Sequence, residues 1–296
     1  MEVHAAHRSR IDRVMEHVRG HLEHDLSLPQ LAKVAGRSPF HFHRLFKAIA
    51  GETLTTFVQR ARLERAAYLM MTSPNRRLDS IALEVGFGGH SDFSRVFKKH
   101  YSLAPSEWDR RSRLDSVSVV EDYERIVSEA RSAQAPPELR VLEQPARTLL
   151  AVRVRAPFIG KPVQEGYQRL VRAMEDRAID WRRRVLVGWS WDNYETTPLE
   201  KVHCCLGFVV EESEAVGDEG VFVERFPRHQ AVQARCNGPM LDIAVAWDVL
   251  YDEWLPVSAY ETDNLPGTKL FVRRPDETGW EHFDVWCSLA IRPAME

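Results

Sequence analysis

The sequence contains one pattern twice, and the second copy begins about fifty residues after the first. LPQLAKVAG followed by SPFHFHRLFKAIA recurs as LDSIALEVG followed by GHSDFSRVFKKHY, with a second turn that is one residue longer. Each copy consists of a short amphipathic segment, a turn that contains glycine and a second amphipathic segment, which is the pattern of a helix-turn-helix unit. The first third of the chain is therefore predicted to be an all-α fold with two helix-turn-helix units.

The second helix of each copy has two different faces. Helical spacing puts an apolar set on one side of the first such helix: Phe42, Leu45, Phe46 and Ile49. The opposite side carries an aromatic ring, an imidazole and two cations: Phe40, His43, Arg44 and Lys47. In the second copy the inward set is Phe93, Val96 and Phe97, and the outward set is Ser91, Ser94, Arg95 and Lys98. Each helix can thus pack on a core through one side and present the other side to a partner.

Double-stranded DNA is a suitable partner for two such faces. A connecting helix is expected from about Thr53 to Met71, and the two units could enter successive major grooves, which recur about every 34 Å. Arg44 and Arg95 can bond guanine O6 and N7, while lysines and serines can meet phosphates or base edges. Phe40 can press on a thymine methyl. The alternative is that single surface arginines are only solvated, and that His90 and His100 only cap or pack.

Charge divides the chain near the same place. Residues 1–114 contain 19 Lys and Arg against 12 Asp and Glu, whereas the rest contains 21 against 31, for a net charge of −3. A basic part before an acidic part indicates a polyanion-binding module joined to another kind of domain, with a solvated charged surface as the alternative. No apolar run approaches the roughly 18 residues of a membrane span, and MEVHAAHRSR lacks the apolar stretch of a secretory signal. We expect a cytoplasmic protein.

An ordered set of motifs runs from about Ile11 to Arg111: LAKVAG, SPFHFHRLFK, Arg62-Leu63 with Ala66, IALEVGF, FSRVFKKHY and the ending from Pro105 to Trp108. Together they resemble the AraC/XylS-type DNA-binding domain, which we assign to residues 1–112. Family members more often carry an aromatic followed by arginine where Trp108 stands. The resemblance implies base contacts by Phe40, His43, Arg44, His90, Ser91 and Arg95.

Strand and helix patterns alternate in the second part of the chain, after a charged segment that we interpret as a linker over residues 113–137. PARTLLAVRVRAP (145–157) aligns with PRHQAVQARCNGP (227–239), and each is followed by an amphipathic helix and then by strands. Residues 138–296 are therefore predicted to form an α/β (α+β) domain of two duplicated βαββ-like units, with a cleft where the units meet.

AVQARCNGP, the helix DIAVAWDVLYDEWLP, VSAYE and the strand VWCSLAI resemble the GyrI-like small-molecule-binding domain over roughly residues 138–293. With the first domain, this resemblance implies a two-domain regulator of the multidrug-sensing type that binds an organic effector. Aromatic rings suit an aromatic or cationic ligand, and ordinary core packing is the alternative for at least half of them. The aromatic candidates are Trp189, Trp191, Tyr194, Trp254, Tyr260, Phe271 and Trp286.

One position departs from the GyrI-like pattern. Relatives commonly carry a buried glutamate two residues before an aromatic on the penultimate strand, and in TKLFVRRP the matching position is Lys269, before Phe271. The lysine either favours an anionic or neutral ligand or points into solvent. Glu195 and Glu261 are possible replacement carboxylates.

The predicted function is sequence-specific transcription regulation in response to a small effector, without a cofactor, a metal or enzymatic activity. DNA, the effector and RNA polymerase are the expected partners, and the protein is a monomer or a dimer. Four cysteines without CxxC spacing indicate reduced thiols: Cys204, Cys205, Cys236 and Cys287. Two alternatives stay open: a hydrolase with Cys204 or Cys236 as nucleophile, and non-specific architectural DNA binding.

Overall fold

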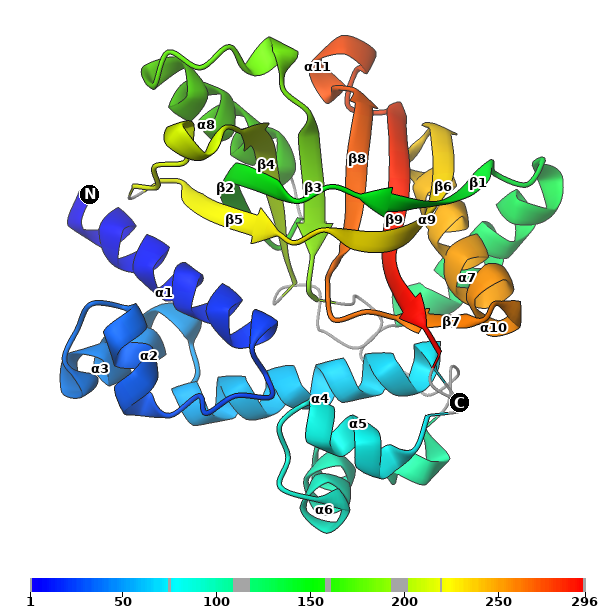
Figure 1. Ribbon diagram of the computed structural model, residues 1–296. Helices are drawn as coiled ribbons and strands as arrows, with labels where there is room; N and C mark the ends of the chain where they lie inside the picture. The colour runs from blue at the N-terminus through cyan, green and yellow to red at the C-terminus, as the bar shows by residue number, and fades with distance from the viewer. Residues whose placement is uncertain are drawn as a thin grey trace. The chain divides into compact units, whose positions relative to one another are not determined.

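The structure is a computed structural model that describes residues 2–73, 76–108, 118–157, 161–192, 202–218 and 220–294 (Figure 1). The chain forms two compact units, Met1–Leu114 and Asp115–Glu296. The first is helical, and the second is an antiparallel sheet with helices. This division into a helical part and a mixed part confirms the two-part fold class predicted from the sequence.

The first unit contains both predicted helix-turn-helix pairs. Its described elements are α1 (Glu2–Gly20), α2 (Leu28–Val34), α3 (Pro39–Ala50), α4 (Leu54–Thr72), α5 (Leu78–Glu84), α6 (His90–Tyr101) and the short η1 (Pro105–Glu107). The turns after α2 and α5 contain Gly36 and Gly86, whose φ angles are 62° and 86°. In each turn the glycine N–H donates to the carbonyl three residues earlier, that of Lys33 or Leu83. The sequence repeat is thus also a repeat of backbone geometry.

Helix α4 joins the two pairs because its two halves belong to different cores. The first half packs with α1, α2 and α3, where the Phe46 and Phe57 rings lie 5.6 Å apart. The second half packs with α5 and α6, where the Phe97 and Trp108 rings lie 5.2 Å apart. Each fully buried side chain of this size contributes about 1.5–3 kcal/mol. Both helix-turn-helix pairs are therefore anchored to one helix by aromatic cores.

The second unit is built on one antiparallel sheet. The described strands are β1 (Leu139–Gln144), β2 (Arg147–Arg155), β3 (Leu186–Ser190), β4 (His203–Val210), β5 (Phe222–Phe226), β6 (His229–Gly238), β7 (Tyr260–Thr262), β8 (Gly267–Arg273) and β9 (Phe283–Pro293). The strand order is β1-β6-β9-β8-β3-β4-β2-β5, and β7 pairs with β9. Strands β8 and β3 are therefore the middle pair of the sheet.

Two long helical segments cover the two ends of the sheet (Figure 1). Helix α8 (Pro162–Asp176) packs mainly on β2 and β4, and α9 (Met240–Asp248) packs mainly on β6 and β9. The strand register puts both helices on one face, called the helix face. The remaining helical elements are α7 (Ser118–Ala133), η2 (Trp181–Arg183), η4 (Glu212–Glu214), the π-helical η5 (Val249–Trp254), α10 (Leu255–Val257) and α11 (Pro275–Thr278).

Helix α7 lies within the segment 113–137 that the sequence suggests as a linker. Its Val127 side chain is only 1% exposed and belongs to a small core with Ala244 and Val249. Arg131 forms an ion pair with Glu253, and Gln134 donates to Asp242. The described part of this segment is therefore packed against α9 and η5.

Candidate functional site

The outward face of α3 is exposed, as its sequence pattern predicts. Phe40 is 68% exposed, and His43, Arg44 and Lys47 are also exposed. The Arg44 guanidinium carbon lies 5.9 Å from the centroid of the Phe40 ring, so the cation rests beside an aromatic face. Since Phe46 and its neighbour Phe42 are fully buried on the other side, the two faces are held in fixed orientations.

The outward face of α6 is similar, with two added side-chain contacts. His90, Ser91, Arg95 and Lys98 are exposed. Ser94 is half-buried, and its hydroxyl lies 3.4 Å from Nε2 of His90. The Arg95 guanidinium donates to the Asp92 carboxylate at 2.6 Å, a partner that our interpretation of the sequence missed. The i, i+3 spacing of an acid and a base on one helix was the signal.

The second helix-turn-helix is attached to the end of α1 through Arg62 of α4. Its Nε donates to the carbonyl of Leu22 at 3.1 Å, and its Nη2 donates to the carbonyl of His24 at 3.1 Å. A Cβ on Gly86 would collide with the same Leu22 oxygen. The turn of the second helix-turn-helix pair therefore packs directly against the chain that follows α1.

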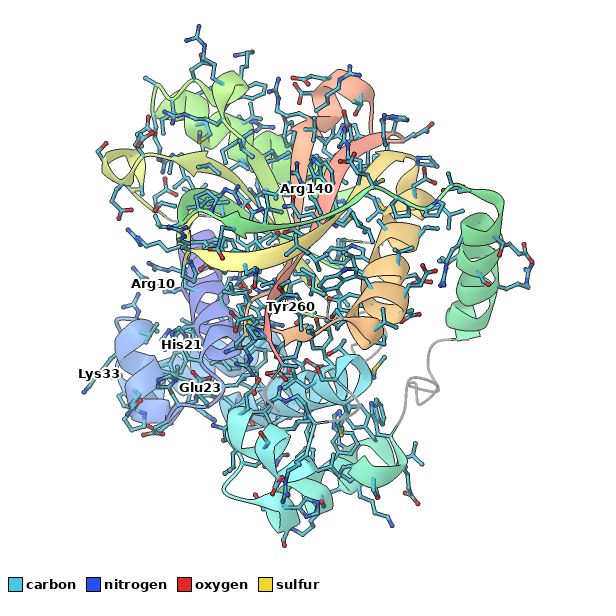
Figure 2. All side chains as sticks on the ribbon, turned by 45° about the vertical axis from the view of Figure 1, so that its right-hand side comes forward. Arg10, His21, Glu23, Lys33, Arg140 and Tyr260 are labelled. Atoms are coloured by element: carbon cyan, nitrogen blue, oxygen red, sulfur yellow. The ribbon has the colours of Figure 1, made fainter. Side chains whose placement is uncertain are left out.

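The aromatic residues proposed for ligand contact lie on two different faces of the sheet. Trp189 is 1% exposed and, with Trp191 and Trp286, belongs to the core on the face opposite the helices. Arg140, labelled in Figure 2, lies 3.6 Å from the centroid of the Trp286 ring. This face holds packed aromatic and cationic groups. Tyr194 and Glu195 lie outside the described residues.

The other candidates lie on the helix face. Trp254 stacks on Tyr260 with ring centroids 5.7 Å apart, and both pack on the core beneath α9; Tyr260 is labelled in Figure 2. Phe271 contacts the cores beneath both helices. Lys269 pairs across the sheet with Gly188 on one side and Cys287 on the other. The Glu261 carboxylate is occupied, since Arg292 donates to it at 2.7 Å.

One aromatic residue that the sequence interpretation missed is Trp247 of α9. It is half-buried, and a Cβ on Gly267 would lie 3.0 Å from its ring. Its ring therefore covers Gly267, two residues before Lys269 on β8. The central floor, defined as Gly188, Gly267, Lys269 and Phe271, thus lies on the middle strands of the helix face. The sequence signal that could have identified Trp247 was a tryptophan on the sheet-facing side of the helix DIAVAWDVLYDEW.

The cysteines are poorly suited to nucleophilic chemistry. Burial raises the pKa of Cys204 and of Cys236 to about 11, and that of Cys205 to about 12. The thiolate is the reactive form, so these side chains stay protonated and unreactive near neutral pH. Within the described residues, no three His, Cys, Asp or Glu side chains gather as a metal site requires. None of the helices described is long and apolar enough for a bilayer span.

Comparison with known families agrees with this arrangement. A model of the GyrI-like small-molecule-binding domain matches residues 137–287, which is more than half of the chain. The chain belongs to the GyrI-like family. A helix-turn-helix model matches residues 31–111, and this region ahead of the GyrI-like unit is of the AraC type.

Similar curated proteins are bacterial. Over 100 residues the GyrI-like chain is 33% identical to the transcriptional regulator Rob of Salmonella typhimurium, a match that covers 34% of each chain. It is 28% identical to the regulatory protein SoxS of the same species, covering 36% of this chain and 98% of SoxS. It is 32% identical to the bifunctional transcriptional activator/DNA repair enzyme AdaA of Bacillus subtilis, and this match covers 36% of this chain and 49% of AdaA. The match thus spans about a third of Rob and half of AdaA.

Proposed function

We propose that the protein is a sequence-specific DNA-binding transcription regulator whose GyrI-like unit binds a small organic effector. Residues 1–112 form the DNA-binding domain, residues 138–296 form the effector domain, and residues 113–137 join them. Base and phosphate contacts are made by Phe40, His43, Arg44 and Lys47 on α3, and by His90, Ser91, Ser94, Arg95 and Lys98 on α6.

The observation that carries the proposal is the exposure of two related cationic faces on helices that one helix anchors. Arg44 and Lys47 are exposed while Phe42 and Phe46 of the same helix are buried. Helix α4 has 19 residues, which corresponds to a length of about 28 Å. That length is comparable to the groove repeat of about 34 Å that two recognition helices of one chain must bridge.

Selection from genomic DNA at physiological salt tests this function, and recovery of one asymmetric motif of about two helical turns is expected. On the recovered site, Arg44→Ala should cost about 1–3 kcal/mol at one base pair, whereas Lys47→Ala should weaken matched and mismatched sites alike. Equal losses on both sites for both variants would indicate non-specific architectural binding, with a steep dependence on salt.

Effector binding acts on DNA affinity or on a contact with RNA polymerase, and a coupling of about 1–3 kcal/mol is typical. One chain carries both helix-turn-helix pairs, so a monomer is sufficient for DNA contact and a dimer through the second unit is compatible with it. A protein that binds the chromosome of a bacterium acts in the cytoplasm. The raised pKa values of Cys204 and Cys236 favour an effector-binding role over a hydrolase, and mass-spectrometric detection of a product would overturn that choice.

We further propose that the effector domain is a duplication of a βαββ-like unit. The strand order supports it: β2-α8-β3-β4 and β6-α9-β8-β9 occupy corresponding places about the middle of the sheet. The preceding strands β1 and β5 correspond as well, since each is an edge strand. Of the predicted ligand contacts, Lys269, Phe271, Trp254 and Tyr260 lie on the helix face, and Trp189, Trp191 and Trp286 lie on the opposite one.

A further inference from the structure

Lys269 stands at the centre of the helix face, between the two halves of the sheet. It lies on β8 and pairs directly with Gly188 on β3, and these two strands are the middle pair. Helices α8 and α9 pack mainly on the strands to either side. A molecule bound above the middle strands would therefore contact the Lys269 side chain and be flanked by a helix on each side.

The Lys269 ammonium has no counter-charge in the described part of the chain. The side chain is half-buried, and no described carboxylate lies within ion-pair distance of it. Asp192 lies two residues after the end of β3, and its Oδ2 accepts from the backbone N–H of His203 at 2.8 Å and lies 3.2 Å from Nδ1 of the His203 ring. Covering an unpaired ammonium with a neutral or cationic molecule is costly, because the charge then loses water without gaining a partner.

The surroundings of Lys269 suit a flat aromatic group. Gly188 and Gly267 have no side chains, so the side chains of Phe271, Lys269 and Trp247 come close to the backbone on both sides of the lysine. A Cβ on Gly188 would lie 3.6 Å from the Phe271 ring and 3.7 Å from the Lys269 Cε, so both side chains lean over this glycine. The Trp247 ring covers Gly267 from the side of α9. Two half-buried aromatic rings thus flank the cation along β8.

We propose that the central floor selects an aromatic carboxylate, whose negative group pairs with Lys269 and whose ring lies against Phe271 and Trp247. The inference rests on the proposed effector-binding function and names its ligand class. This arrangement of two aromatic rings and Lys269 differs from an aromatic cage for cations, because the side-chain charge on the central floor is positive. A cationic aromatic molecule would meet the same rings but would be repelled by the ammonium.

Two probes of matched shape and opposite charge test the proposal: 2-naphthoate and 2-naphthylmethylammonium, titrated into the full-length protein by calorimetry. We expect the anion to bind at least about tenfold more tightly, since a hydrogen bond to a charged group contributes enough for that factor. Lys269→Met should abolish the preference, and Lys269→Glu should reverse it. Lys161→Met, at an exposed lysine of the same unit, should leave it unchanged.

A variant that adds volume to the central floor without changing its charge separates the effect of the Lys269 charge from the effect of the ligand's location. A Cβ at Gly188 would make only ordinary contacts of 3.4–3.7 Å, so Gly188→Ala should fold, which melting curves can verify. It should weaken both probes while keeping the preference for the anion. Tighter binding of the cation by the wild type, a preference that survives Lys269→Met, or no binding of either probe would each overturn the aromatic-carboxylate site. The selection from genomic DNA is independent of these titrations, so either proposal can fail alone.

Discussion

Replacing Gly86 by alanine should be much more destabilising than the same change at Gly36. Both glycines occupy the turn of a helix-turn-helix pair at positive φ, where an L residue costs about 1 kcal/mol more than glycine. A Cβ on Gly36 would meet nothing within 4 Å. Gly36→Ala should therefore cost only this conformational term of about 1 kcal/mol.

Gly86→Ala adds a steric term to the same conformational cost. The new Cβ would collide with the backbone carbonyl oxygen of Leu22 and lie 2.7 Å from Nη2 of Arg62. The carbonyl cannot rotate away as a side chain can, and Arg62 Nε already donates to it at 3.1 Å. Overpacking of this kind typically costs about 1–3 kcal/mol, so we expect a total of about 2–4 kcal/mol.

Hydrogen exchange measured by mass spectrometry on the full-length chain can follow the two pairs separately, because it reports local opening. Peptides from α5 and α6 should lose protection in Gly86→Ala far more than peptides from α2 and α3 do in Gly36→Ala. Equal losses in the two variants would refute the steric argument and leave only the backbone conformation as the cause.

Three other predictions concern buried charge, thiol protonation and the packing of α7. Arg60→Met should lower the stability of the first unit by about 3–5 kcal/mol, because two carboxylates would lose their ion-pair partner. Glu52 and Glu64 accept from Arg60 at 2.6 and 2.7 Å. A melting curve like that of the wild type would contradict this prediction. Burial raises the pKa of Cys205 to about 12 from 9.0. Because the unfolded chain therefore loses this thiol proton first, the free energy of unfolding keeps its full value below pH 9 and falls as the pH rises through 12. Urea titrations from pH 8 to 11 should show this fall, and Cys205→Ala should reduce its slope. Val127→Asp would put a carboxylate against Ala244 and Val249, and should abolish exchange protection of α7 while α8 stays protected; retained protection of α7 would show that this contact does not hold the helix.

Local periodicity was sufficient to predict the first unit, because its helices bury one face each. Phe42, Phe46, Phe93 and Phe97 are fully buried where their spacing puts them. Helical spacing also contained the Asp92–Arg95 pair, which was overlooked among the outward residues. The contact between Gly86 and the chain after α1 joins residues far apart in sequence, and no local pattern encodes it.

The second unit was less predictable, because alternation separates two faces of a strand without saying which face a helix will cover. Gly188 and Trp189 are neighbours on β3, yet the first lies beneath the helices and the second is buried on the opposite side. That choice depends on the packing of α8 and α9 against strands distant in the chain. The placement of α7 against α9 depends on tertiary contacts in the same way.

Strand pairing at the two edges of the sheet has a consequence for how the second unit holds together. β1 precedes β2 in the chain but pairs with β6, and β5 precedes β6 but pairs with β2. The two halves of the sheet have exchanged their edge strands, as the subunits of a domain-swapped dimer do, but within a single chain. A cut in the segment between β4 and β5 would therefore yield two interlocked pieces, neither of which has a complete sheet alone.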